Sequence, residues 1–172
     1  MPRKCVQIYT GEGKGKTTAA MGLALRALGH GWKVLLIQFL KPPGGSGETG
    51  FSLRLPGFES MQFGGRAFVR SVPPAPADRE RAAQGLKAAE KRMGEGWDMI
   101  ILDEILQAVS LGLIEEEKVL GLLRNRPDSV ELVLTGRGAT AALIAAADLV
   151  TEMVAVKHPY AKGMPARPGI EY

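Results

Sequence analysis

The chain has 172 residues, of which 45% are hydrophobic, and it carries 22 Lys and Arg against 18 Asp and Glu, a formal net charge of +4. This length suits a single domain (1–172) with a central sheet and is too short for two catalytic domains. The single cysteine, Cys5, excludes an internal disulfide, and the two histidines are too few for a zinc cluster.

Basic residues gather in the first half of the chain. Residues 1–86 contain 12 Lys and Arg against 5 Asp and Glu, whereas residues 87–172 contain 10 against 13. Because no basic stripe is interleaved with aromatic residues, this asymmetry favours a small anionic ligand over nucleic acid. The sequence has neither an apolar signal region nor a run of about 18 apolar residues, so we expect a cytoplasmic protein with no membrane partner.

The first predicted elements enclose a glycine-spaced basic loop. An apolar run, Val6–Tyr9, predicts a strand, and the small-residue segment Thr18–Leu25 predicts a helix. Between them lies Gly11–Thr17, with the sequence GEGKGKT. Glycines let successive backbone N–H groups converge on one anion, and the helix N-terminus favours negative charge, so this order predicts a phosphate-binding loop. A Gly- and Lys-rich surface turn is the alternative interpretation.

Two side chains of the loop have specific expected roles. Lys16 adds a positive charge next to the phosphates, and Thr17 offers a hydroxyl to a phosphate-bound Mg²⁺. The general pattern has glycine where this chain has Thr10, and Gly11 is displaced by one position. The residues expected to bind the nucleotide are Gly11, Glu12, Gly13, Lys14, Gly15, Lys16, Thr17 and Thr18.

The next stretch combines a buried strand with a long irregular region. Lys33–Leu40 is almost continuously apolar and predicts a parallel strand covered on both faces. Residues 41–76 are rich in Gly, Pro and Ser and hold one short strand candidate, Ser60–Phe63. Such a region is typically functional or mobile, and a passive surface loop is the alternative. A helix is predicted to follow to about Met93, with Asp78 as its N-cap.

The second chemical signal is the segment Trp97–Glu104, whose apolar run ends in adjacent carboxylates. A parallel strand would deliver these carboxylates to the carboxyl edge of the sheet, beside the phosphate loop of a neighbouring strand. Asp103 is then expected to hold Mg²⁺, directly or through water, together with Thr17, and Glu104 is a further candidate ligand. The alternative is that these acids only cap the next helix.

The last elements complete an α/β pattern. Acidic residues at Glu115–Glu117 suit a helix N-terminus, and Val130–Leu134 predicts another strand. That strand leads to Arg137, which either pairs with a phosphate or forms a surface ion pair. A helix at about 139–147 and a strand near Leu149–Val154 follow. We predict a doubly wound sheet of five or six parallel strands with helices on both faces.

Several further blocks, read together with the loop, resemble one enzyme family. These blocks are Ile101–Ile105, Arg126-Pro127, Leu134–Arg137, Ala147–Met153, Lys157–Tyr160 and Gly169–Tyr172. In this order and approximate spacing they resemble the ATP:corrinoid adenosyltransferases of vitamin B12 metabolism over nearly the whole chain. The family's loop starts Thr-Gly, which accounts for the displaced glycine. The resemblance implies a RecA-like P-loop NTPase fold.

The resemblance also implies a reaction. The 5′-deoxyadenosyl group of ATP would pass to the cobalt(I) of a corrinoid, with release of inorganic triphosphate. ATP is then a co-substrate, and the metal is Mg²⁺ or Mn²⁺. The implied catalytic residues are Lys16, Thr17 and Glu104. Further implied partners are a flavoprotein reductase and a second subunit in a homodimer. A P-loop small-molecule kinase or ATPase is the second candidate, and a nonenzymatic nucleotide switch is the third.

Corrinoid contacts are implied for the long irregular region. Relatives commonly show Gly-Phe-x-Trp there, and in this chain Phe68 matches the Phe while Arg70 replaces the Trp. Leu106 stands where the family often has Asn. The segment Lys157–Tyr172 has little periodicity and would by itself suit a frayed tail, whereas the resemblance implies an ordered lid or a subunit contact.

Overall fold

The computed structural model describes residues 4–44, 47–51, 55–65 and 73–171, and within them it shows one six-stranded sheet in which every strand pairing is parallel. The strand order is β3-β2-β4-β5-β1-β6. The strands are β1 (Val6–Thr10), β2 (Val34–Phe39), β3 (Phe58–Phe63), β4 (Met99–Asp103), β5 (Glu131–Thr135) and β6 (Leu149–Glu152). The prediction of five or six parallel strands is confirmed.

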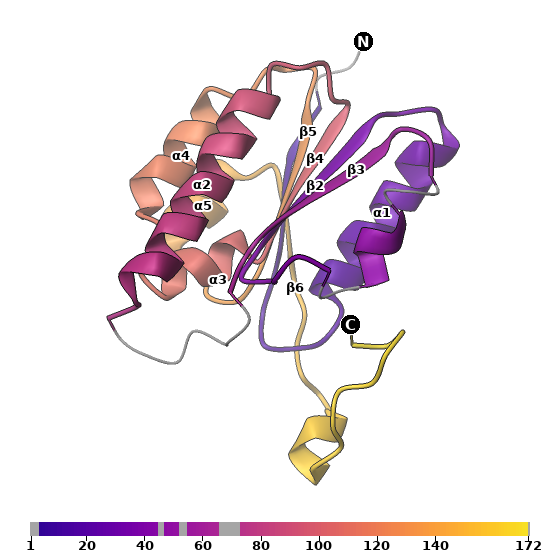
Figure 1. Ribbon diagram of the computed structural model, residues 1–172, viewed down its shortest axis with the longest axis vertical. Coiled ribbons are helices and arrows are strands. Elements are labelled where there is room, and N and C mark those ends of the chain that lie inside the picture. Colours follow the sequence, from indigo (N-terminus) through magenta and orange to yellow (C-terminus); the bar gives the residue numbers. More distant parts are fainter. Residues whose placement is uncertain (1–3, 45–46, 52–54, 66–72, 172) are drawn as a thin grey trace.

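Helices cover both faces of this sheet, as predicted (Figure 1). One face carries α1, and the other carries α2, α3, α4 and α5. The helices are α1 (Lys16–Gly29), α2 (Pro76–Arg92), α3 (Ile105–Ser110), α4 (Glu116–Arg124) and α5 (Ala141–Ala146), with short 3₁₀ helices at Gly47–Phe51 and Pro159–Lys162. Among the described residues, none of these helices has the length and apolar character needed to cross a membrane.

The central strands are buried because both faces are covered. Every residue of β2, β4 and β5 is buried, which is the pattern expected of parallel strands between two helical layers. Small residues of α1, namely Ala20, Ala24 and Ala27, pack in the smaller of two cores, and this lets the helix approach the sheet closely. The edge strand β6 is exposed along its whole length. The central strands therefore provide a rigid base for the loops at their carboxyl ends.

Some predicted boundaries were wrong for local reasons. Ala75 caps α2, Pro76 occupies the first turn, and Asp78 lies inside that turn, where its carboxylate pairs with Arg81. Proline suits this position because its missing N–H has no helical partner there. The strand in the long irregular region is longer than predicted, since β3 begins at Phe58 and pairs with β2 along its whole length.

Candidate active site

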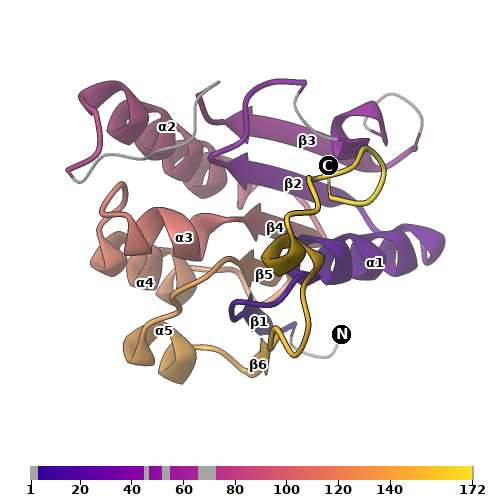
Figure 2. The same cartoon turned by 90° about the horizontal axis from the view of Figure 1, so that it is seen from below.

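The phosphate loop and the acidic pair lie at the same carboxyl edge of the sheet but not on adjacent strands. Strand β5 separates β1, which leads into the loop, from β4, which ends at Asp103. The prediction of a neighbouring strand was wrong in this respect. The inserted strand ends at Thr135, whose hydroxyl donates to Asp103, and the Thr17 hydroxyl donates to the same carboxylate from the start of α1. Seen from below, the C-terminal segment crosses this edge near β1, β5 and α1 (Figure 2).

The glycine spacing of the loop is required by close contact with the segment after β6. A Cβ atom on Gly11 would lie 2.5 Å from the carbonyl oxygen of Met153, and one on Gly13 would lie 2.7 Å from the same atom. The Gly13 N–H donates to that carbonyl at 2.6 Å. Gly11 also has a φ of 98°, a conformation that favours glycine. The displaced glycine is thus fixed by backbone packing.

The loop leads into a helix N-terminus that carries no side-chain cap. Gly15, with a φ of 119°, is the N-cap of α1, and it has no side chain to satisfy the first N–H groups. These donors and the positive end of the helix dipole face the inside of the loop, an arrangement that suits an anion.

The Lys16 side chain is buried within the loop. Its ammonium donates to the carbonyl oxygens of Gly11 at 2.7 Å and Gly13 at 2.8 Å. Burial lowers the pKa of Lys16, although the charge of Glu104 opposes this effect. The ammonium is therefore held close to where an anion in the loop would lie.

Asp103 is the fully buried centre of a polar network. One of its carboxylate oxygens, Oδ1, accepts hydrogen bonds from the hydroxyls of Thr17 and Thr135, each at 2.7 Å. The other, Oδ2, accepts from the Gln38 amide at 3.0 Å and pairs with the Lys41 ammonium at 3.0 Å. Burial raises the pKa of Asp103, but the Lys41 charge and the donated hydrogen bonds outweigh it and leave the pKa below its ordinary value. This carboxylate is anionic.

Glu104 differs from Asp103 in both conformation and electrostatics. It has a φ of 64° as the N-cap of α3, and its N–H donates to the Thr135 hydroxyl at 2.9 Å. Burial and the adjacent Asp103 charge raise the pKa of its carboxyl. It lines a cavity of about 380 Å³. Thr17, Thr18, Lys41 and Glu48 line the same cavity.

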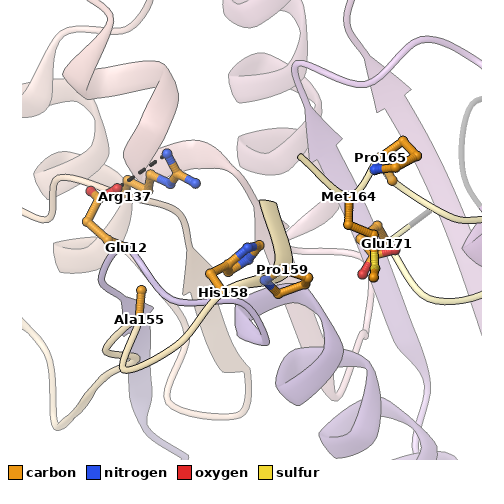
Figure 3. A pocket seen from close by; sticks show the side chains of 9 residues that line it. Glu12, Arg137, Ala155, His158, Pro159, Met164, Pro165 and Glu171 are labelled. Atoms are coloured by element: carbon orange, nitrogen blue, oxygen red, sulfur yellow. Dashed lines mark ion pairs between the residues drawn. The ribbon is translucent and has the colours of Figure 1, made fainter. Parts of the chain in front are cut away.

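A second cavity, of about 550 Å³, lies at the other end of the loop. Arg137 and Glu12 face each other on one side of it, with 3.3 Å between guanidinium nitrogen and carboxylate oxygen (Figure 3). His158, Pro159 and other residues of the C-terminal segment form the opposite wall. Arg137 is mostly exposed, so this ion pair leaves its guanidinium accessible to a ligand.

The structure brings together most of the residues predicted from the sequence. Lys14 lies at the loop, with its ammonium 4.0 Å from a carboxylate oxygen of Glu171 in the C-terminal segment. Phe68, predicted to contact a corrinoid, and Arg70 lie outside the described residues.

Sequence reasoning missed three polar partners of Asp103, namely Gln38, Lys41 and Thr135. Gln38 is the one polar residue of β2, which could have marked it. Lys41 and Thr135 lie at or just after the carboxyl ends of their strands, the edge where ligands bind in such sheets.

The donor set fits a magnesium ion that is also held by phosphates. Within the described residues no three His, Cys, Asp or Glu side chains converge as a complete metal site. The Thr17 hydroxyl and the anionic Asp103 carboxylate are nevertheless in contact, and Glu104 lines the adjoining cavity. Mg²⁺ is commonly bound by one or two carboxylates plus phosphate and water oxygens, so a partial protein site of hard oxygen donors is what it requires.

Comparisons with known proteins find relatives that match nearly the whole chain. The family model described as ATP:corrinoid adenosyltransferase BtuR/CobO/CobP matches residues 2–172. A corrinoid adenosyltransferase of Pseudomonas aeruginosa is 36% identical over 171 residues, 99% of this chain and 84% of that protein. A corrinoid adenosyltransferase of Escherichia coli K12 is 34% identical over 171 residues, which are 99% of this chain and 86% of that protein. The crystal structure of the flagellar accessory protein FlaH of Methanocaldococcus jannaschii superimposes with a TM-score of 0.58 at 13% identity, covering 88% of this chain and 72% of that one.

Proposed function

The chain belongs to the ATP:corrinoid adenosyltransferase family BtuR/CobO/CobP, and on that premise we propose that its loop grips the triphosphate of ATP as a leaving group. Cobalt(I) of the corrinoid substrate attacks the ribose C5′, a cobalt–carbon bond forms, and the C5′–O bond breaks with its electron pair departing on the triphosphate. The observation that carries the proposal is the convergence of buried Lys16, the uncapped N-terminus of α1 and the Thr17–Asp103 hydrogen bond at one edge.

Stabilising the leaving group is the main chemical task of these residues. Cobalt(I) is itself a strong nucleophile, so no side chain has to remove a proton from it. Lys16 and the first N–H groups of α1 neutralise charge as the triphosphate departs, and such pre-arranged donors lower a barrier because they need no reorganisation. The protein also holds C5′ and the corrin next to each other. Well-oriented intramolecular reactions reach effective molarities of about 10⁵–10⁸ M, so this proximity accelerates the reaction further.

Magnesium binding is assigned to Thr17 and Asp103, with Glu104 as a further ligand or substrate-orienting group. When bound, the ion would supply positive charge to the phosphate oxygens. The low pKa of Asp103 keeps an anionic donor ready at neutral pH, and its hydrogen bond to Thr17 places both oxygens side by side. Mn²⁺ offers similar chemistry through the same hard oxygen ligands.

The nucleotide is proposed to lie in an unusual orientation relative to ordinary phosphate-loop enzymes. In the ordinary orientation the γ-phosphate lies beside the loop lysine. Here C5′ rather than the γ-phosphorus must be exposed to attack. The cavity between Arg137 and the C-terminal segment, at the Glu12 end of the loop, offers space for the nucleoside. A structure with bound ATP tests this, and a γ-phosphate beside Lys16 would contradict it.

Finer features remain proposals that rest on the family. We propose a single-domain, cytoplasmic homodimer that receives electrons from a flavoprotein reductase, with Phe68 against the corrinoid. Sedimentation of the purified chain tests the dimer, and a monomer at micromolar concentration would contradict it. Phe68→Ala tests the aromatic contact, with weaker corrinoid binding as the expected result.

The decisive experiment is an anaerobic incubation with ATP, Mg²⁺ and a chemically reduced corrinoid. Loss of the cobalt(I) absorption spectrum together with release of inorganic triphosphate is the expected result. ADP or orthophosphate as the main product would instead indicate a kinase or an ATPase. Omitting the corrinoid provides the control, since triphosphate release should then stop.

A further inference from the structure

Lys41 forms an ion pair with Asp103 at the cavity that Thr17 and Glu104 line. Its ammonium lies 3.0 Å from Asp103 Oδ2, while Thr17 contacts the other oxygen of the same carboxylate. The Asp103 side chain is fully buried, whereas the Lys41 side chain is 27% exposed and reaches it from the cavity that Thr17 and Glu104 also line. A cation therefore already neutralises the carboxylate to which the proposed function assigns Mg²⁺.

The backbone around Lys41 is constrained to make this contact. The preceding residue, Leu40, has a φ of 65°, a conformation that is unfavourable for a residue other than glycine and persists only where the surrounding structure holds it. Gly64, directly after β3, permits this close approach, because a Cβ atom there would lie 2.3 Å from the Lys41 backbone nitrogen. The chain thus turns sharply after β2 and directs Lys41 to Asp103.

A second carboxylate is available to the same ammonium. Glu48 lines the cavity, and its Oε2 atom is buried without a hydrogen-bond partner among the described residues. Burial lowers the pKa of Lys41, but the charges of Asp103 and then Glu48 raise it above the ordinary value, so both carboxylates act on this ammonium. An unsatisfied buried carboxylate oxygen is costly, and a cation that moves to it removes that cost.

We propose that Lys41 is the counter-ion of Asp103 only while no divalent cation is bound, and that it moves to Glu48 when the cation arrives with ATP. The inference rests on the proposed metal role of Thr17 and Asp103. Its consequence is coupling: a divalent cation alone must compete with a tethered ammonium, whereas a cation carried by ATP brings phosphate oxygens that compensate for the exchange. Lys41 is a positioning residue, since it acts through the two carboxylates.

Manganese titrations followed by electron paramagnetic resonance test the exchange without any corrinoid. Lys41→Met removes the charge and retains much of the length, so Mn²⁺ alone should bind about tenfold or more tightly than to the unmodified protein. Lys41→Arg keeps the charge and should bind Mn²⁺ as weakly as the unmodified protein. Equal Mn²⁺ affinity of Lys41→Met and the unmodified protein would overturn the proposal.

Thermal unfolding separates this effect from damage to the fold. In EDTA, Lys41→Met should unfold at a lower temperature because Asp103 loses its counter-ion, and Mn²⁺ should raise its midpoint more than that of the unmodified protein. If Lys41→Met does not fold, Lys41→Gln serves for both measurements. An equal response to Mn²⁺ in variant and unmodified protein would count against the exchange.

Glu48→Gln tests the receiving position. This variant should bind Mn²⁺ with ATP about threefold to tenfold more weakly, since the displaced ammonium loses its acceptor. Unchanged binding would exclude Glu48 from the exchange. If the unmodified protein binds no Mn²⁺ even with ATP, the metal site of the proposed function is wrong and the exchange fails with it. If Mn²⁺ binds normally with ATP but Lys41→Met does not change the Mn²⁺ affinity, the exchange is rejected and the proposed metal site is not.

Discussion

At the scale of single residues, the site places two carboxyl groups, those of Asp103 and Glu104, next to each other. Their surroundings shift the two pKa values in opposite directions. Asp103 is held anionic by Lys41 and by two hydroxyl donors, whereas the pKa of the adjacent Glu104 is raised by burial and by the Asp103 charge. Lys16 is buried against backbone carbonyls and has a lowered pKa. Shifted pKa values of this kind concentrate at functional sites, because such sites bury charged groups and place like charges side by side.

Lys16→Ala is expected to reduce triphosphate release by about a hundredfold or more, since it removes a pre-arranged cation from the leaving group. Rates of triphosphate formation with reduced corrinoid measure the effect. The matched control is Lys91→Ala, on the exposed surface of α2, which should retain the rate of the unmodified protein. A loss of less than threefold in Lys16→Ala would contradict the assigned role.

Glu104→Gln is expected to increase stability while it decreases activity. A carboxyl whose pKa is raised in the folded state destabilises that state when it is ionised, and the penalty is absent once both folded and unfolded states are protonated. The variant should therefore be more stable at about pH 8, with the difference vanishing as the pH falls below the ordinary value of 4.5. Urea unfolding at several pH values measures this. A less stable variant at pH 8 would contradict it.

At the scale of elements, packing decides which local preferences are realised. A Cβ atom on the exposed Gly22 in α1 would meet no other atom within 4 Å, whereas one on Gly85 in α2 would lie 2.8 Å from Phe39 and 3.1 Å from Phe63. Both glycines weaken their helices by intrinsic propensity. Of these two glycines, only Gly85 is needed for packing, because the absence of a side chain there lets α2 approach β2 and β3.

These two glycines form a matched pair of variants. Gly22→Ala should raise the free energy of unfolding by about 0.5–1 kcal/mol through helix propensity. Gly85→Ala should lower it by about 1–3 kcal/mol because the aromatic side chains must shift. Chemical denaturation of both variants measures the difference. Stabilisation by Gly85→Ala would show that the contact with α2 is loose.

At the scale of the whole molecule, the sheet forms a base and the C-terminal segment forms a wall. Figure 1 shows this segment extending below the carboxyl edge of the sheet, and its last residues line a cavity together with Thr17 and Thr18 of α1. Its described residues are largely exposed, yet they line both cavities beside the phosphate loop. The segment therefore contributes little to the cores and much to the surroundings of a bound nucleotide.

Truncation after Val156 tests this division. We expect the free energy of unfolding to change by less than about 1 kcal/mol, because exposed ion pairs such as Arg167 with Glu171 contribute little. ATP affinity should fall by about tenfold, as expected when a covering segment is lost. Calorimetric titration with ATP measures the affinity. Unchanged ATP binding would show that the segment serves another role.

The sequence by itself determined the phosphate loop, the acidic pair, the parallel sheet and the family. The first three depend on residues close together in the chain: glycine spacing around Lys16, an apolar run before Asp103, and continuous apolar strands. The family depends on several such short blocks in a fixed order along the chain. Such patterns can be recognised in the sequence because the periodicity of apolar residues within a short window indicates the secondary structure that the window forms.

Only the tertiary structure decided which strands are adjacent and which polar groups meet. The insertion of β5 between β1 and β4, the contact of Gly11 and Gly13 with Met153, and the Lys41–Asp103 ion pair all join residues far apart in the chain. No local pattern specifies such pairings, because they depend on how the helical layers bring the carboxyl ends of separate strands together. The phosphate-binding loop can thus be identified in the sequence, while the counter-ion of Asp103 is determined only when the sheet is assembled.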